Sequence, residues 1–263
     1  MAPVRLGAVS YLNTKPLVEG LAERADLFTL RFDVPARCAD LLHDGTVDVG
    51  LIPVIEYPRG DYRIVPEVAI GSNGEIASVA LFSRVPVRQI RSLALDESSR
   101  TSVALTKVLC EHRWNISPTL VPSGPTLDET LLDADAALVI GDPALSLNPT
   151  ESRTSKIDLG AEWQALTGLP FVFAVWAGRD GVLGREHVRE LQRARSRGER
   201  ALPGIAAEFG GRDPVRTARA LVYLRDNLKY ALGPLERAGL RRFFELAAAQ
   251  DLIPAVPSLS FYE

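Results

Sequence analysis

Short apolar runs alternate with polar and amphipathic segments through the first half of the chain, which is typical of α/β folds. Three of these runs are expected to be buried strands: Val4–Val9, Leu27–Phe32 and Val47–Ile52. Between them, one predicted helix opens at Pro16 and ends near Glu23, and a second runs from Pro35 to Gly45. Proline is favoured in the first turn of a helix and glycine just after its end. The resulting βαβαβ order predicts a parallel sheet.

A comparable unit follows later in the chain. Its expected elements are a strand at Leu93–Leu95, a helix at Arg100–Glu111, a helix at Pro125–Leu132 and a strand at Ala136–Ile140. After Gly178 the leucines and phenylalanines recur at helical spacing, so the rest of the chain is expected to be helical. The second unit therefore predicts a second sheet.

Two long apolar stretches, Ser78–Ser83 and Phe171–Ala177, bracket the middle block. Strands that bracket an inserted block often cross between lobes, so we expect a discontinuous first lobe (residues 1–84 plus 178–263) and a second lobe (residues 85–177). A ligand cleft between them is expected near the carboxyl ends of the strands. Two crossovers form a hinge that lets the lobes close over a ligand.

Composition excludes several classes of function. The chain has 263 residues, and 30 basic against 33 acidic side chains give a net charge of −3, which removes the electrostatic case for nucleic-acid binding. Its two cysteines and three histidines are scattered, so neither a metal site nor a cofactor is expected. The N-terminus lacks the pattern of a secretory signal, and no apolar run approaches the ~20 residues that span a bilayer. We therefore expect a cytoplasmic protein.

The loop after the first strand carries polar side chains suited to orienting a ligand without adding charge. Ser10 and Tyr11 offer hydroxyl groups and Asn13 offers an amide. In an open α/β sheet this loop borders the ligand crevice. The alternative is local: Asn13 or Thr14 caps the helix that Pro16 opens.

Ser98, Ser99, Arg100, Thr101 and Ser102 gather at the start of a predicted helix. Four hydroxyl groups, an arginine and the helix N-terminus together suit an anion. An N-cap needs only one serine, so the density of the cluster favours ligand binding over a capped, solvated turn.

Three further places complete the expected site. Gly141 and Asp142 end the second unit's strand, where Asp142 either binds a hydroxyl group, acts as a base or caps the helix before Pro143. Ser78 begins the first crossover stretch and Thr167 lies in the loop before the second. Ser78 is expected to line the cleft, and the loop that carries Thr167 either lines it too or is an ordinary turn.

Five motifs together resemble those of the chorismate dehydratase family, which belongs to the futalosine route to menaquinone. They are Val9–Leu17 (VSYLNTKPL), Asp48–Tyr57 (DVGLIPVIEY), Leu95–Ser102 (LDESSRTS), Asp135–Leu145 (DAALVIGDPAL) and Thr167–Trp176 (TGLPFVFAVW). The resemblance implies a two-lobed periplasmic-binding-protein-like (Venus-flytrap) α/β fold. It also implies loss of water from chorismate, giving 3-[(1-carboxyvinyl)oxy]benzoate.

Two alternatives differ from this assignment in testable ways. A sister family of the same fold, which makes 1,4-dihydroxy-6-naphthoate, opens with a Cys-Pro-Asn-Asp type loop and has a His-Glu pair where this chain has Gly141-Asp142. A non-catalytic small-anion-binding protein would use the same cleft but, as a transport receptor, would need a signal peptide.

The chemistry expected of the resemblance assigns roles to the loops. The helix start from Ser98 to Ser102 would hold a carboxylate of chorismate, and Asn13 would hydrogen-bond the leaving hydroxyl or the enolpyruvyl group. Asp142 and Glu56 are the only carboxylates near strand ends in the motifs. The loops offer no good general base, so we hypothesise that the substrate's own side-chain carboxylate takes the proton.

Overall fold

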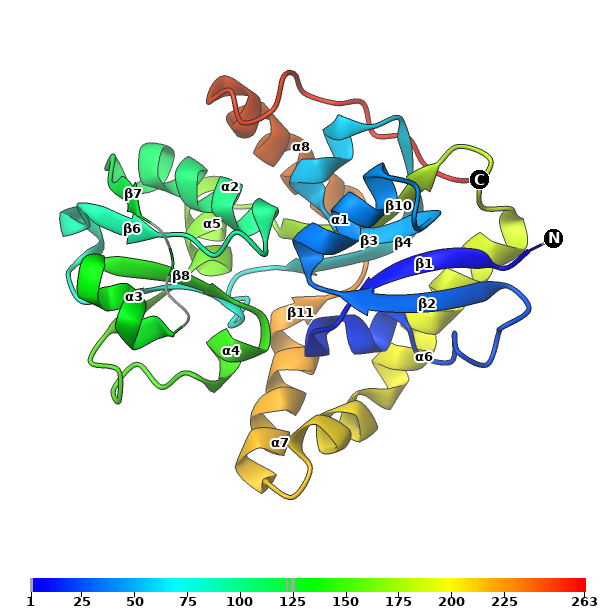
Figure 1. Ribbon diagram of the computed structural model, residues 1–263, viewed down its shortest axis with the longest axis horizontal. Helices are drawn as coiled ribbons and strands as arrows, with labels where there is room; N and C mark the ends of the chain where they lie inside the picture. Colours follow the sequence, from blue (N-terminus) through cyan, green and yellow to red (C-terminus); the bar gives the residue numbers. More distant parts are fainter. Residues whose placement is uncertain (1, 122, 124–125) are drawn as a thin grey trace.

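The computed structural model describes residues 2–121, 123 and 126–263, and it contains two sheets. The first sheet has the order β11 (Leu228–Lys229), β4 (Tyr62–Ser72), β10 (Phe171–Arg179), β3 (Val49–Pro53), β1 (Val4–Val9), β2 (Phe28–Asp33). The second has the order β7 (Thr119–Val121), β6 (Ser92–Ala94), β8 (Ala136–Ile140), β5 (Val79–Ser83), β9 (Ser155–Asp158). Figure 1 shows the two sheets side by side, and we call the part built on the first lobe 1 and the part built on the second lobe 2.

Helices cover both sheets. The α-helices are α1 (Pro35–His43), α2 (Arg100–Leu109), α3 (Leu127–Asp133), α4 (Gly141–Ser146), α5 (Leu159–Thr167), α6 (Arg185–Gly210), α7 (Pro214–Val222) and α8 (Pro234–Ala249). Shorter helical turns are η1 (Leu12–Leu17), η2 (Val54–Arg59), η3 (Val87–Gln89), η4 (Cys110–Trp114) and η5 (Tyr223–Asn227). The two-lobed α/β fold predicted from the sequence is thereby confirmed.

The three strands and the second helix of the predicted N-terminal βαβαβ unit form. Strand β1 pairs in parallel with both β2 and β3, and α1 begins with Pro35 in its first turn. The chain leaves α1 through Gly45, whose φ of +77° suits glycine. Strands β10 and β11 then add antiparallel pairs, so the complete sheet is mixed rather than purely parallel.

One predicted helix is wrong in type and position. In place of an α-helix from Pro16 to Glu23, the chain forms the 3₁₀ turn η1, which contains Pro16. Helix α6 crosses this turn at Gly198, where a side chain would collide with the Pro16 backbone at 2.0 Å. Because α6 passes so close to Pro16, the chain beneath it forms a compact turn. The position of Pro16 in the sequence does not indicate this long-range contact.

Two connections join the lobes. Residues 73–78 lead from β4 to β5, and α5 with residues 168–170 leads from β9 to β10. The predicted lobe boundaries, residues 1–84 plus 178–263 for the first lobe and 85–177 for the second, stay a prediction. Two strands belong to a different sheet than these boundaries imply. Strand β5 pairs within the second sheet and β10 within the first, so neither apolar stretch itself crosses between lobes.

An aromatic core lies where the second connection enters lobe 1. Trp163 of α5 packs edge-on against Phe171 and Phe243, and all three are completely buried. Trp176 is also fully buried. Within the described residues, no helix is both long and apolar enough to cross a bilayer. The helix predicted from Pro125 is observed from Leu127, and Pro125 lies outside the described residues.

Candidate active site

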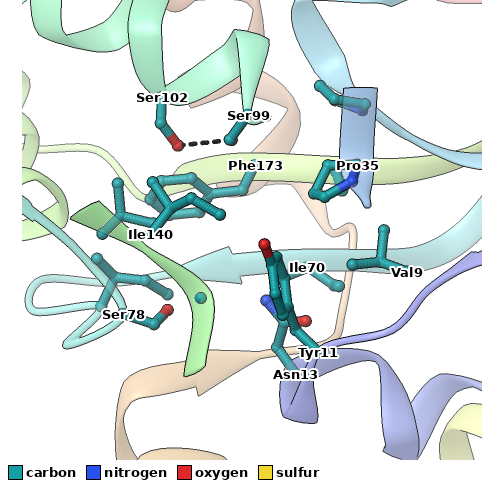
Figure 2. A pocket seen from close by; sticks show the side chains of 15 residues that line it. Val9, Tyr11, Asn13, Pro35, Ile70, Ser78, Ser99, Ser102, Ile140 and Phe173 are labelled. Carbon is teal, nitrogen blue, oxygen red and sulfur yellow. Dashed lines mark hydrogen bonds between the residues drawn. The ribbon is translucent and has the colours of Figure 1, made fainter. Parts of the chain in front are cut away.

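A cavity of about 50 Å³, partly open to solvent, lies between the two lobes, and we call it the cleft cavity. Its lining combines apolar and neutral polar residues: Val9, Tyr11, Asn13, Pro35, Pro53, Ile70, Ile76, Ser78, Val79, Ser99, Ser102, Ile140, Gly141, Phe173 and Ala174. The carboxyl ends of β1, β3 and β8 contribute to it, as open α/β sheets lead one to expect. Figure 2 shows Tyr11 and Asn13 on one side of this space and Ser99 and Ser102 on the opposite side.

Six residues named from the sequence meet in this lining: Tyr11, Asn13, Ser78, Ser99, Ser102 and Gly141. They come from positions far apart in the chain and from both lobes. The capping alternative for the first loop is not what forms, because Asn13 lies inside η1 and the residue before that turn is Tyr11.

Ser99 and Ser102 form a hydroxyl pair at the start of α2. Their Oγ atoms are 2.8 Å apart, and Ser102 is only 1% exposed. Ser99 precedes the helix, yet its side chain accepts no hydrogen bond from the helix backbone. Its hydroxyl is therefore available toward the cavity, next to the positive end of the helix dipole.

The other residues of the same cluster point elsewhere. The Arg100 guanidinium donates to Glu56 at 3.1 Å and to Asp40 at 2.8 Å, and the Thr101 hydroxyl accepts the Ile55 amide at 3.2 Å. Residues 99 and 102 share one face of the helix start, whereas each intervening residue is turned by about 100° from the last. The expectation that all five residues contact the ligand is thus corrected: Arg100 and Thr101 attach α2 to lobe 1.

Ser98 takes an intermediate position. Its carbonyl accepts the Ala36 amide of α1, and its side chain lies near enough to the phenol of Tyr11 to lower the pKa of that group. Burial raises the pKa of Tyr11, and the charges of Asp96 and Asp142 add to that rise. Tyr11 is therefore a neutral hydrogen-bond donor at neutral pH, placed at the cavity edge.

Gly141 and Tyr11 meet across the cleft. Gly141 has a φ of +68°, and a side chain on it would lie 2.8–2.9 Å from the Tyr11 ring. Glycine is required there both by the left-handed backbone and by the close approach of the ring. Tyr11 therefore packs directly on the backbone of the other lobe.

The carboxylate of Asp142 bridges the lobes rather than facing the cavity. It accepts the Leu12 amide with its two oxygens at 3.0 and 3.3 Å, and so binds the N-terminus of η1. Burial raises its pKa, against the lowering effects of the Leu12 amide and of the Arg216 and Lys15 charges. Asp142 does not cap α4, and it is not among the residues that line the cavity.

Ser10, Thr167 and Glu56 lie away from the described lining. Ser10 is exposed, and the Thr167 hydroxyl donates to the Trp163 carbonyl at 3.0 Å. Glu56 is 2% exposed and is enclosed by His43, Arg59 and Arg100. Ser10 therefore does not line the cavity as expected, and Thr167 fits the alternative of an ordinary turn.

Sequence reasoning missed Tyr223, which stands behind the cavity wall. Its phenol donates to Ser78 Oγ at 2.8 Å, and its side chain is completely buried. Tyr223 is 145 positions from Ser78 and begins η5 after α7. Its helical surroundings gave no signal of a polar role, because only the fold brings it to Ser78.

The structure offers no evident metal-binding set. Across the described ranges, no three His, Cys, Asp or Glu side chains lie together as metal ligands do. Cys38 and Cys110 are buried thiols, and burial raises the pKa of each to about 12. Thiols with so high a pKa are unreactive at neutral pH.

The chain is similar to known proteins. A family model described as menaquinone biosynthesis matches residues 4–249. The chorismate dehydratase of Thermus thermophilus is 30% identical over 93% of this chain and 95% of its own length.

Solved structures agree on the fold. A protein from Archaeoglobus fulgidus superposes with a TM-score of 0.75 at 18% identity, covering 96% of this chain and 99% of that one. The alkanesulfonate-binding protein SsuA of Xanthomonas axonopodis pv. citri, bound to MOPS, gives a TM-score of 0.69 at 17% identity, covering 98% and 95%. At such identities the likeness shows the periplasmic-binding-protein-like fold alone.

Proposed function

This chain belongs to the menaquinone biosynthesis family, and from that membership we propose that its cleft cavity dehydrates chorismate to 3-[(1-carboxyvinyl)oxy]benzoate. The family predicted from the five sequence motifs is confirmed. The relative from Thermus thermophilus, which matches nearly end to end, carries the name of this activity. The protein is accordingly a hydro-lyase of menaquinone biosynthesis.

The reaction asks the protein for orientation more than for strong acid or base. A ring C–H bond and the neighbouring C–OH bond break, the C–H electron pair becomes a ring double bond, and the proton and hydroxide leave as water. Because the product ring is aromatic, the reaction is thermodynamically favourable without any contribution from the protein. The protein must hold the reacting groups in line, exclude water and stabilise the departing hydroxyl group.

The observation that carries the mechanism is the neutral character of the cavity wall. Among the described residues that line it, none is an aspartate, glutamate, histidine, lysine or arginine. Donors are instead the hydroxyls of Ser78, Ser99 and Ser102, the amide of Asn13 and the phenol of Tyr11. This make-up supports a substrate-assisted step, in which the enolpyruvyl carboxylate of chorismate takes the ring proton.

The two walls suggest how chorismate lies. The hydroxyl pair at the start of α2 suits a carboxylate, because hydroxyl donors and the helix dipole act there together. Asn13 and Ser78, on the opposite wall, suit the leaving hydroxyl group. A ligand that touches both walls spans the two lobes.

The decisive experiment incubates the purified protein with chorismate and records ultraviolet spectra and mass. Loss of one water with the appearance of an aromatic spectrum is expected. Tight binding without a mass change would instead indicate an anion-binding protein of the same fold. Neither binding nor reaction would contradict the proposed substrate.

Asn13→Ala tests the assigned wall. Loss of an oriented donor to the leaving group is expected to lower kcat by about 10²- to 10³-fold, as removal of an oxyanion-hole donor does. Asn148→Ala is the matched control, because Asn148 is exposed and bonds only within its own turn among the described contacts. Equal rates for the two variants would remove Asn13 from the mechanism.

A further inference from the structure

Tyr223 is a buried polar residue that the cavity lining does not include. Its phenol oxygen lies 2.8 Å from Ser78 Oγ and is the donor in that bond. The Asn13 side chain also lowers the pKa of this phenol, which places it close by. One hydroxyl group of η5 therefore binds Ser78 and lies near Asn13, two polar residues of the wall that faces the α2 serines.

The direction of each hydrogen bond follows from the inventory of donors and acceptors. The Thr14 hydroxyl donates to Asn13 Oδ1 at 3.3 Å, which leaves the Asn13 NH₂ group for other partners. Tyr223 has one proton and donates it to Ser78, so toward the nearby Asn13 amide its oxygen can act only as an acceptor. Ser78, having accepted from Tyr223, keeps its own hydrogen for the cavity that it lines.

We propose that Tyr223 is a positioning residue for the dehydration: its buried phenol orients the Asn13 amide and the Ser78 hydroxyl so that each directs a hydrogen atom into the cleft cavity. The inference rests on the proposed function and adds to it a residue outside the cavity wall. Burial raises the pKa of Tyr223, so the phenol keeps its proton and the chain of donors keeps its direction at neutral pH.

The test compares Tyr223→Phe with Tyr230→Phe in steady-state dehydration of chorismate. Tyr223→Phe keeps the ring but leaves two polar groups unoriented, and it is expected to lower kcat about 5- to 100-fold. KM is expected to change less than about threefold, because the loss is felt mainly in the transition state. Tyr230 is also completely buried, and within the described residues its hydroxyl has no hydrogen-bond partner, so Tyr230→Phe is expected to keep the wild-type rate.

A double variant separates positioning from packing. If Tyr223 acts partly through Ser78, the fold loss of kcat in the double variant Tyr223→Phe/Ser78→Ala is smaller than the product of the fold losses in the two single variants. Multiplying effects would indicate packing damage and overturn the inference. Thermal unfolding of each variant identifies any loss that comes from misfolding.

The wild-type protein in the same assay distinguishes the two proposals. Wild-type turnover with an unchanged kcat in Tyr223→Phe overturns the positioning role and leaves the proposed function intact. Absence of turnover in the wild type overturns the proposed function, and the role of Tyr223 falls with it.

Discussion

The carboxylate of Asp142 accepts the Leu12 amide across the contact between the lobes. Asp142→Asn keeps an oxygen for that bond, and the cavity wall itself contains no acidic residue among those described. A general base contributes about 10²- to 10⁴-fold, so a loss of kcat below about 10-fold is expected if the substrate supplies the base. Abolished turnover with intact chorismate affinity would make Asp142 the base instead.

The same variant changes how stability depends on pH. Burial raises the pKa of Asp142 above its ordinary value, so the folded protein holds this proton more tightly than the unfolded chain. The contribution of Asp142 to folding is thus fully present at low pH and is lost as pH rises through the folded-state pKa. The free energy of unfolding of Asp142→Asn, relative to wild type, is expected to be larger at pH 7 than at pH 4 in urea titrations. An equal difference at both values would contradict the raised pKa.

Gly141→Ala tests the contact with Tyr11. The new methyl group would meet the Tyr11 ring at under 3 Å and would also strain a backbone with a φ of +68°. We expect a loss of stability of about 1–2 kcal/mol from the left-handed backbone, together with at least a tenfold loss of kcat/KM as Tyr11 is displaced.

Gly168→Ala is the matched control for that substitution. Gly168 has a φ of +70° but no atom within 4 Å of an added side chain. It therefore carries the backbone strain without the clash, and its activity is expected to persist. If both variants lose activity equally, strain rather than Tyr11 explains the effect.

How much of the site the sequence could predict depends on whether a contact is local. Ser99 and Ser102 were found because hydroxyl groups at a helix start are a local signal. Arg100 and Thr101 carry the same signal but are turned to lobe 1, and only the partners Glu56 and Ile55 reveal it. Tyr223 had no local signal, since its bond to Ser78 depends on the whole fold.

At the scale of elements, the start of α2 contacts both the cavity and lobe 1, through two different faces of the helix. One face presents the serine pair to the cavity, and the other joins α2 to α1 and η2 through Arg100. The serines are consequently fixed relative to lobe 1 as well as lobe 2. Attachment of this helix sets the width of the cleft.

Arg100→Met measures that attachment. Removing the guanidinium leaves buried Glu56 with fewer partners, and a loss of about 1–3 kcal/mol in the free energy of unfolding is expected. KM for chorismate is expected to change little, because Arg100 is not in the cavity lining. Chemical unfolding and steady-state kinetics check the two effects.

Arg242→Met supplies the control for a lost surface pair. Arg242 and its partner Glu245 are both substantially exposed, and such a pair is worth about 0–1 kcal/mol. A tenfold rise in KM for Arg100→Met alone would restore the original expectation that this arginine binds the anion.

Elements differed in how well their pattern predicted them. Strands β1 and β8 have the residues predicted, because both are short runs of mostly apolar, buried residues, with Arg5 of β1 as the exposed exception. Strand β4 was not predicted, since Pro66 interrupts it and Glu67 takes a φ of +65°. Its pairing partners, β10 and β11, come from the second half of the chain.

For the whole molecule, the two-lobed fold was predictable because its motifs occur in order along the chain. The exact crossover segments were not predictable, because an apolar stretch has the same sequence pattern whether it pairs within one sheet or passes between two sheets. Strand β5 lies wholly in lobe 2 and β10 wholly in lobe 1 (Figure 1). Pairing, rather than hydrophobicity, decides membership of a lobe.

The strand order of the six-stranded sheet also governs what happens while the protein is being made. Strand β4 lies between β10 and β11, and β3 meets β10 on its free side, so all these pairings wait until lobe 2 has been synthesised. The five-stranded sheet is complete once β9 has left the ribosome, and lobe 2 can therefore fold first. Until β10 follows, the nascent chain exposes unpaired edges of β3 and β4, which are templates for aggregation. The interval before β10 is synthesised is thus when this chain is most exposed to aggregation.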